Sequence, residues 1–431
     1  MLCGALFALV GCAVSDPGIA VDDDITTFAV ATWSAGGDVR SRVEVDGPDG
    51  PWLVTDWEAP EAIHSANLLG LLPGTEWTAR AVTEDGESSN DIPFSTGALP
   101  PEVPGFSTTG TPGWEGYLLT AFIGDPSVVV ILDEAGRVVW YRQAKTGERV
   151  LRVRLRPDGS GLRYAEIEPV EITEKSALIE VDWGGQETSR IGVDKFHHDF
   201  ADAEGGGAAC LVTDIRPGRS GADVLGDSIV IVEEDGTQTP VWSSWDVWDV
   251  PADSSMEKHS WTHANAIDND PVGGGYWLGL RDLSTIAQVL PDGSVGTLIG
   301  GDDSSYAFPE STDLPKFQHQ FQMLEGGVLM FDDRDPTTGE DSRLLELNLD
   351  DSAMTATAAW TWHHDPTFSI YALGDVDRAA DGSTLGVYSS AGVIVDLSPE
   401  GEVRWELGTE LAVGIPYVVR LSELPGVQRV R

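Results

Sequence analysis

The stretch Val129–Trp140, VVILDEAGRVVW, has the pattern of a β-hairpin: an apolar strand, an acidic turn with glycine, and a second strand that ends at tryptophan. The shared pattern, an apolar strand, an acidic or glycine turn and a second strand that often ends near tryptophan, returns at Leu178–Ile191, Ile229–Trp242, Thr285–Leu298, Leu344–Trp360 and Val393–Trp405. The acidic turn residues are 49, 53, 57, 58 and 50 positions apart; they are Asp133, Asp182, Asp235, Asp292, Asp350 and Glu400. A hairpin that recurs about every 50 residues is typical of a β-propeller blade.

We therefore predict an all-β chain in which residues 105–431 form a six-bladed β-propeller that carries the functional site. Each hairpin is expected to be the outer strand pair of a four-stranded blade. Residues 25–98 predict a small β-sandwich that resembles a fibronectin type III domain, because Leu71–Trp77, LLPGTEW, is similar to the corner of that domain with tryptophan in place of tyrosine. The segment LPPEVP, residues 99–104, is expected to be a stiff linker.

Composition agrees with this fold class and limits the partners. The 431 residues include 49 glycines, 25 prolines and 15 tryptophans, which favour turns and strands. There are 71 acidic and 26 basic residues, and the net charge is −45. A nucleic acid or an anionic membrane surface would be repelled by this charge. Such a protein would bind an anion only where positive side chains gather.

Residues 1–24 predict an export segment followed by an acidic linker. Leu9–Cys12, LVGC, resembles a bacterial lipobox, which implies lipidation at Cys12 and a periplasmic or cell-surface location. The apolar run is too short to span a membrane, so a lipid anchor would be the only membrane contact. A simple signal peptide or a misassigned start site are the alternatives. At most Cys12 and Cys210 would remain after cleavage, so no disulfide framework is implied.

The inner halves of the repeats can also be aligned. His319–Leu329, HQFQMLEGGVL, matches Asp375–Leu385 and Arg152–Leu162 without a gap, and His198 and His263 take the same position with short insertions. If this position lies near the start of each innermost strand pair, these side chains converge on the central channel. Three of the eight histidines would then form one ring. The alternative is a polar ring that only lines the channel with water.

The stretch Trp261–Leu290 adds a cation to this ring. It carries His263 and Asn265 at the start of one strand and Arg281 at the start of the next segment. An imidazole beside a guanidinium suits an oxyanion such as sulfate or phosphate. A structural histidine beside a salt-bridged arginine is the simpler alternative.

Other chemistry is less well supported by the sequence. The arginine disfavours a metal cation among the histidines, so we expect neither a metal nor a cofactor. The doublet His363–His364 is expected in a solvated loop or at the channel rim. His197 neighbours His198 on a strand, so the two side chains should point to opposite faces, and His197 is left with a supporting role. No nucleophile elbow or phosphate loop is found. A histidine nucleophile remains, because imidazole can attack a sulfuryl or phosphoryl centre and hold it covalently.

Three segments resemble those of the bacterial arylsulfotransferases, the PAPS-independent aryl-sulfate sulfotransferases. They are FHHD at 196–199, THANAI through GLR at 262–281, and QHQF through FDD at 318–333. The histidine and asparagine of the second segment, with arginine eighteen positions after the histidine, are its most specific part. The resemblance covers about residues 105–410. It implies an exported six-bladed propeller that passes a sulfuryl group from a phenolic sulfate ester to a phenol through a sulfohistidine, without a cofactor.

Carried over by position, the resemblance makes His319 the sulfated nucleophile. It makes His198, His263 and Arg281 the groups that bind the sulfuryl, with His263 or His198 moving the proton. Asn265 would orient His263 or contact substrate. Further candidates for substrate binding are Arg152, Asp375 and His197. Some family members have a disulfide near the active site, whereas this chain has no cysteine after Cys210.

Two other functions stay open at this stage. One is a non-catalytic propeller that binds an anionic glycan or a partner protein, with the sandwich as an adaptor. The other is a sulfatase or phosphatase, in which water is the acceptor. Three histidines and one arginine in a single ring favour transfer over mere binding, but the sequence does not separate a phenol acceptor from water.

Overall fold

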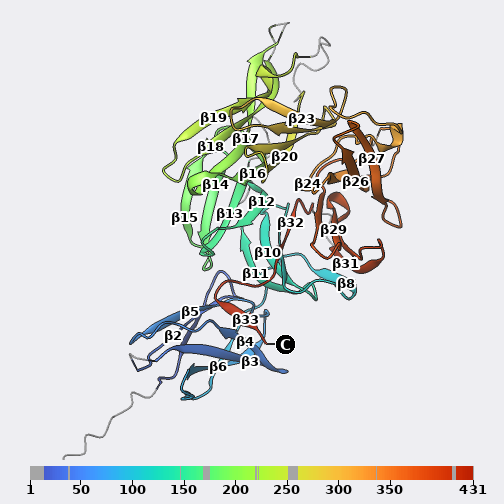
Figure 1. Cartoon of the computed structure of the whole chain (residues 1–431). Coiled ribbons are helices and arrows are strands. Elements are labelled where there is room, and N and C mark those ends of the chain that lie inside the picture. Colours follow the sequence, from blue (N-terminus) through green and yellow to red (C-terminus); the bar gives the residue numbers. More distant parts are fainter. Residues whose placement is uncertain are drawn as a thin grey trace, which may run out of the picture.

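The computed structural model describes residues 14–36, 39–145, 147–167, 175–218, 221, 223–250, 261–335, 337–409 and 414–430. The predicted lipidation site, Cys12, lies outside these residues. The all-β prediction is confirmed: the described chain contains strands and short 3-10 turns and no α-helix. Figure 1 shows a small part built around the N-terminal strands and a larger part of several sheets. No segment of the described chain forms a helix with the length and apolar character of a membrane span.

The small part consists of two sheets that share one hydrophobic core. The first sheet has the order β1 (Gly18–Val21), β2 (Ala29–Trp33), β5 (His64–Leu68). The second has the order β33 (Val427–Arg429), β4 (Gly50–Thr55), β3 (Ser41–Gly47), β6 (Glu76–Thr83), β7 (Ile92–Ser95). Alternating residues such as Trp33, Val45 and Trp77 point into the core. The limits 25–98 stay a prediction, and strands β1 and β33 outside those limits complete the two sheets.

The larger part contains six antiparallel sheets of four or five strands, formed in chain order. The first is β9 (Tyr117–Phe122), β10 (Val128–Asp133) and β11 (Val138–Gln143), with β32 (Val418–Leu421) on β9. The second is β12 (Arg149–Leu155), β13 (Gly161–Ile167), β14 (Ala177–Asp182) and β15 (Glu187–Gly192). The third is β16 (Phe196–Asp202), β17 (Ala208–Pro217), β18 (Asp223–Val232) and β19 (Gln238–Ser243).

The remaining three sheets follow the same plan. The fourth is β20 (Ala264–Asn269), β21 (Tyr276–Leu280), β22 (Thr285–Val289) and β23 (Val295–Gly300). The fifth is β24 (Phe321–Leu324), β25 (Gly327–Asp332), β26 (Arg343–Asp350) and β27 (Thr355–Trp362). The sixth is β28 (Asp375–Arg378), β29 (Thr384–Tyr388), β30 (Val393–Leu397) and β31 (Val403–Thr409), with β8 (Phe106–Gly110) on β31.

The hairpins read from the sequence are the outer strand pairs of these sheets. In the first of them, Ile131 pairs with Trp140 across β10 and β11. The Asp133 carboxylate accepts the backbone N–H groups of Ala135 and Arg137, and Gly136 has a φ of 72°, which only glycine adopts without strain. An acid followed by glycine therefore closes this turn, whereas the fifth hairpin, Leu344–Trp360, has no glycine and places Met354 at a positive φ of 52°.

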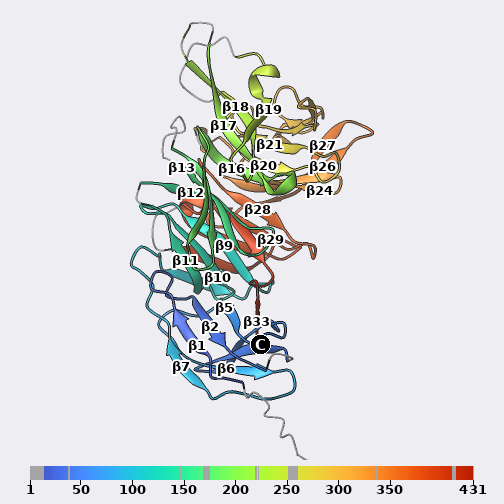
Figure 2. The same ribbon diagram turned by 90° about the vertical axis from the view of Figure 1, so that its left-hand side faces the viewer.

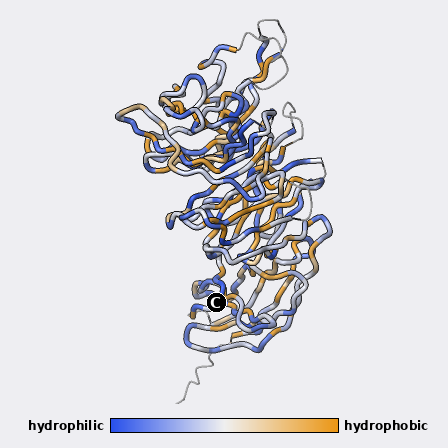
Figure 3. Tube along the Cα trace, turned by 90° about the vertical axis from the view of Figure 1, so that its right-hand side faces the viewer, coloured by the Kyte–Doolittle hydropathy of each residue, from blue (hydrophilic) through white to orange (hydrophobic). Residues whose placement is uncertain are grey.

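The two ends of the larger part are linked to each other. Strand β8 precedes β9 in the chain but pairs with β31, and β32 follows β31 but pairs with β9. The first strands of neighbouring sheets also contact one another, as β12 with β16, β16 with β20, and β24 with β28. The arrangement is propeller-like. Figure 2 shows the small part beside the sheets, and Figure 3 shows that many of their strands are hydrophobic. Chain segments that precede the first strands of different sheets thus come close together.

Candidate active site

The three repeat-equivalent histidines gather at the starts of three neighbouring first strands. His198 lies in β16, His263 immediately precedes β20, and His319 precedes β24 by two residues. The rings of His198 and His263 lie 5.0 Å apart between centroids. Both residues have positive φ, 53° and 50°, which is uncommon for a residue with a side chain. Strained backbone of this kind often marks a functional site.

Arg281 brings a positive charge to these histidines. It follows β21, and its backbone N–H donates to the carbonyl of His263 over 3.1 Å. Its Nη1 lies 2.6 Å from the carboxylate of Asp282, and its Nη2 donates to the carbonyl of Tyr371 over 3.3 Å. The guanidinium also lies over the ring of Phe317, 5.0 Å from its centroid. The cation is therefore fixed in place from several sides.

His319 is buried between a carboxylate and a backbone amide. Its Nδ1 lies 2.8 Å from Oδ2 of Asp333, which is fully buried. Its Nε2 accepts the backbone N–H of Leu373 over 2.8 Å. An acceptor Nε2 carries no proton, so in the neutral ring the proton is on Nδ1, facing Asp333. Nε2 is thus the unprotonated nitrogen of the ring, and its lone pair accepts the Leu373 N–H.

Burial decides the charge of the cluster. It lowers the pKa of His319 to about 3, assisted by the nearby charge of Arg281. Burial also holds the pKa of His198 well below its ordinary value, with further contributions from the neighbouring imidazoles. Burial raises the pKa of Asp333 well above its ordinary value, and the nearby charge of Arg281 opposes this shift. At neutral pH His198 and His319 are therefore neutral imidazoles beside one permanent cation.

A second chain of groups lies behind His198. The expectation that His197 and His198 point to opposite faces is wrong: their Nδ1 atoms are 2.9 Å apart, because the positive φ of His198 interrupts the regular strand. Nε2 of His197 is 3.1 Å from Oδ1 of Asp227. The other oxygen of Asp227 accepts the Thr262 hydroxyl and the Ala264 backbone N–H. Thr262 and Ala264 flank His263 in the chain. The carboxylate of Asp227 therefore fixes His263 through these neighbours and His198 through His197.

Asn265 has a supporting place. It is fully buried, and its side-chain amide donates to the carbonyl of Gln318 over 2.9 Å. Gln318 directly precedes His319, so Asn265 fixes the backbone that carries the predicted nucleophile. The predicted contact of Asn265 with substrate or with His263 stays a prediction.

Arg152 and Asp375 belong to a separate polar cluster. Nε of Arg152 lies 3.0 Å from the carboxylate of Asp199, and its guanidinium lies over the ring of Tyr417. Asp375 accepts the backbone N–H groups of Val376 and Val418, and burial raises its pKa to about 7. Both side chains therefore have partners away from the histidines, and their proposed role in substrate binding stays a prediction.

The His363–His364 doublet differs from the expectation of a solvated loop. His364 is buried: its Nδ1 is 2.8 Å from the carbonyl of Pro366, and its Nε2 is 3.1 Å from Glu406. Its ring also packs against Phe368 and Tyr388. Only His363 is exposed. The doublet does follow β27 outside any strand, and the channel-rim alternative stays a prediction. The burial of His364 was not foreseen, because Tyr388 and Glu406 come from later parts of the chain.

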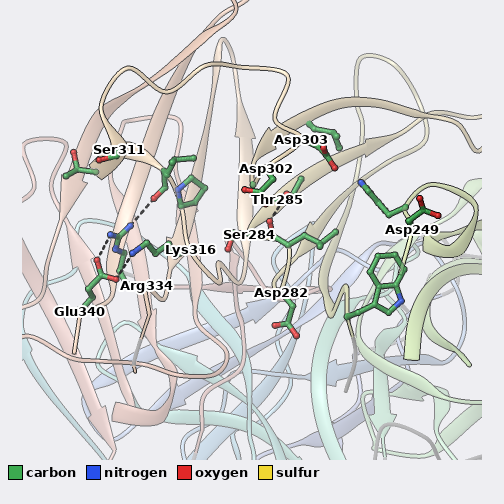
Figure 4. A pocket seen from close by; sticks show the side chains of 18 residues that line it. Asp249, Asp282, Ser284, Thr285, Asp302, Asp303, Ser311, Lys316, Arg334 and Glu340 are labelled. Carbon is green, nitrogen blue, oxygen red and sulfur yellow. Dashed lines mark hydrogen bonds and ion pairs between the residues drawn. The ribbon is translucent and has the colours of Figure 1, made fainter. Parts of the chain in front are cut away.

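A cavity of 860 Å³ adjoins the cluster, within the usual size range of ligand pockets. The link is Asp282, which lines the cavity, contacts Arg281 and lies 3.9 Å from Nδ1 of His263. Trp248 contributes aromatic surface to the lining, and the buried Trp261 lies behind it. Figure 4 shows Glu340 joined to Arg334 and Lys316 on one side, whereas Asp249, Asp302 and Asp303 lie elsewhere around the cavity.

Several of these groups were not singled out from the sequence. Asp282 follows the predicted arginine directly, and Asp333 ends a segment already noted for its pattern, so both had a local signal. Asp227 and the Leu373 amide had none, because they reach the histidines only through folding.

Fold and site together define a class: a propeller-like, all-β protein with buried neutral imidazoles around a guanidinium, a setting suited to a transferred oxyanion. The family model of the arylsulfotransferases (ASST) matches residues 117–410, more than half of the chain. The chain belongs to this family.

Solved structures show more distant likenesses. One is a protein of unknown function from Bacteroides caccae, with 13% identity over 70% of this chain and 98% of that chain and a TM-score of 0.44. Another is an auxiliary nutrient binding protein from Bacteroides thetaiotaomicron, with 9% identity over 92% and 85% and a TM-score of 0.38. A streptogramin B lyase has 10% identity over 73% and 98%, with a TM-score of 0.38. No curated protein matches the chain.

Proposed function

We propose that the protein moves a sulfuryl group from a phenolic sulfate ester to a phenolic acceptor through a sulfohistidine at His319. Family membership supports arylsulfotransferase activity in general. The observation that carries the finer proposal is the setting of His319, a neutral imidazole whose Nδ1 faces Asp333 and whose unprotonated Nε2 accepts the Leu373 N–H. We also propose that the six sheets are blades of a closed propeller and that the small part is a fibronectin III-like sandwich.

In the donor half-reaction, Nε2 of His319 attacks sulfur, and the S–N bond forms as the S–O bond to the phenol breaks. The guanidinium of Arg281 stabilises the negative charge on the sulfuryl oxygens. The imidazole becomes positive as it is sulfated, and the Asp333 carboxylate beside Nδ1 stabilises that charge.

The Leu373 amide takes part in this step. It donates to the lone pair that must attack, so it has to move from Nε2 before sulfur approaches. The same N–H is then near a sulfuryl oxygen and can donate to it. Tyr371, two residues earlier, accepts from Arg281 through its carbonyl, and this contact must also yield to the sulfuryl. The resting site is therefore occupied by its own backbone until the donor binds.

The cavity beside Asp282 is the proposed site for the aryl group. Its volume accommodates a phenol, and the partly exposed Trp248 offers aromatic surface for stacking. In the acceptor half-reaction, a second phenol enters after the first has left and attacks the sulfur of sulfo-His319. This order gives a two-step exchange at one site.

A transfer assay tests the proposal. Purified protein is incubated with 4-nitrophenyl sulfate, with and without phenol, and release of nitrophenol and formation of phenyl sulfate are measured. We expect release that depends on phenol, and a radiolabelled sulfuryl group that stays on wild-type protein when phenol is absent. His319→Ala should lose both signals. His363→Ala, an exposed histidine outside the site, serves as the matched control and should retain them.

Other outcomes would support a different function or a different nucleophile. Release that proceeds equally without phenol would indicate a sulfate-ester hydrolase. A His319→Ala variant that still accumulates label would remove His319 as the nucleophile. Absence of release, together with tight binding of a sulfated glycan, would favour the non-catalytic alternative.

A further inference from the structure

Behind His198 lies a buried chain of proton-carrying groups that the sulfuryl chemistry above does not use. His197 is 3% exposed, His198 8% and Asp227 1%. Nδ1 of His198 faces Nδ1 of His197, and Nε2 of His197 faces Asp227. Nε2 of His198 is therefore the nitrogen left for the cluster, where the ring contacts His263. The order of groups from the site inward is His198, His197, Asp227.

The geometry allows two proton arrangements and excludes others. Two Nδ1 atoms 2.9 Å apart share one proton, because two bare nitrogens or two N–H groups would repel. Nε2 of His197 carries a proton, since it faces a carboxylate. If His197 is neutral, His198 donates from Nδ1 and has a bare Nε2. If His197 is an imidazolium beside Asp227, it donates to His198, which then presents Nε2–H to the site.

We propose that His197 and Asp227 hold a proton in the resting protein that resupplies His198 when it protonates the leaving phenolate; this inference rests on the proposed transfer function. The leaving phenolate takes up a proton in the first half-reaction, and the acceptor phenol gives one up in the second. The first half-reaction therefore empties the store, and the second refills it.

The steps balance. When the donor reacts, the Nε2 proton of His198 passes to the leaving phenolate oxygen, and the Nδ1 proton of His197 passes to Nδ1 of His198. His197 becomes neutral beside Asp227. When the acceptor reacts, its hydroxyl proton passes to Nε2 of His198, and the Nδ1 proton of His198 returns to His197. His198 is the catalytic acid and base, and His197 and Asp227 are positioning residues that act through it.

Asp227→Asn tests the store with little change of shape. The amide oxygen can still accept from Thr262 and Ala264, but the amide NH₂ would face Nε2 of His197 and remove the negative charge that stabilises the imidazolium. His197→Asn breaks the chain at the next group and is the second variant. Asp396→Asn is the matched control, since Asp396 is a buried strand carboxylate paired with Arg404 outside the site.

The measurement is the single-turnover rate of phenol release from two donors. The leaving group of 4-nitrophenyl sulfate is weakly basic and needs little protonation, whereas that of phenyl sulfate is more basic. For Asp227→Asn and His197→Asn we expect a loss of about 10²–10⁴-fold with phenyl sulfate and less than about 10-fold with 4-nitrophenyl sulfate. Wild-type protein should show a solvent deuterium isotope effect with phenyl sulfate that these variants lack. Asp396→Asn should retain the wild-type ratio between donors.

Equal losses with both donors would show that Asp227 and His197 only support the structure and would overturn the proposal, as would full activity of the variants with phenyl sulfate. If one variant does not fold, the other and the isotope effect on wild-type protein decide. Failure of the transfer function itself looks different: wild-type protein would release phenol from neither donor.

Discussion

At the scale of single residues, His319 shows how burial prepares a nucleophile. An exposed imidazole is partly protonated near neutral pH, and the protonated ring has no lone pair for attack. Here burial and the charge of Arg281 lower the pKa to about 3. Asp333 faces Nδ1 of the ring, so Nε2 is the nitrogen that reacts, and it carries no proton.

The pH dependence of the donor half-reaction follows from this shift. Because the native pKa of His319 lies below its ordinary value, the nucleophile stays neutral as the pH falls through about 6.5. We expect kcat/KM for 4-nitrophenyl sulfate to show no acidic limb near that pH. Short assays, with return of samples to neutral pH to detect denaturation, check this. An inflection close to the ordinary histidine value would contradict the buried neutral state.

Arg281 has two separable effects on the reaction at His319. Arg281→Ala should lower kcat/KM by about 10²–10³-fold, because the charge on the sulfuryl oxygens loses its fixed partner. It should also move the acidic limb toward neutral pH, since Arg281 is one cause of the low pKa of His319. Arg281→Lys keeps the positive charge but lacks the planar guanidinium group. We therefore expect kcat/KM to fall while the acidic limb of the pH profile stays at its wild-type position. Parallel pH profiles of both variants measure this, and identical profiles would be the contrary result.

At the scale of elements, Asp199 of β16 ties several sheets together beneath the histidines. Its carboxylate lies 3.0 Å from Arg152 on β12. It also accepts the backbone N–H of Ile267 on β20 and the side-chain amide of Gln320, which directly precedes β24. One buried charge thus joins four sheets whose relative positions set the distances between the three histidines.

Asp199→Asn should therefore destabilise the protein through the Arg152 it leaves unpaired. Removal of one partner of a buried ion pair costs about 3–5 kcal/mol. We expect this decrease in the free energy of unfolding measured by urea titration, with a fall in activity because the histidines lose their common anchor. Asp235→Asn, in an exposed turn, is the control and should keep the wild-type midpoint. A midpoint for Asp199→Asn equal to that of wild-type protein would show that the pair contributes nothing.

The elements differ in how far the sequence predicts them. The six hairpins are local, so an acid, a glycine and two apolar runs suffice to locate the strands around a turn such as Asp133–Gly136. The histidines could be grouped because a repeat places equivalent residues at equivalent points of each sheet. Asp227 could not, since it lies in the third strand of its sheet and meets Thr262, 35 positions away, only in the folded chain. The burial of His364 could not be predicted for the same reason.

At the scale of the whole molecule, the net charge of −45 shapes what can enter the cavity. Asp249, Asp302 and Asp303 line it, whereas Lys316 and Arg334 are paired with Glu340. The cavity lining is therefore acidic in net charge, and Arg281 lies beside it, paired with the lining residue Asp282. An acceptor with a second negative group would be repelled, and one with an ammonium group would be attracted.

This predicts a preference among acceptors. With 4-nitrophenyl sulfate as donor, kcat/KM for 4-(2-aminoethyl)phenol should exceed that for 4-hydroxyphenylacetate, and added salt should narrow the gap by screening. The double variant Asp302→Asn/Asp303→Asn should also reduce the difference in kcat/KM between the two acceptors. Asp158→Asn, on an exposed turn away from the cavity, should leave that difference unchanged. A preference for the carboxylated phenol would show that the acceptor does not enter through this cavity.

Strand β33 has a consequence for how the molecule is made. Residues 427–429 pair with β4, whose residues are synthesised near the beginning of the chain. The second sheet of the small part is therefore incomplete until residues 427–429 have emerged, by which time all six sheets of the larger part are available. The N-terminal part, first to be made, is thus among the last to be completed. Its final strand closes the chain on itself, so fraying at one terminus is opposed by residues from the other.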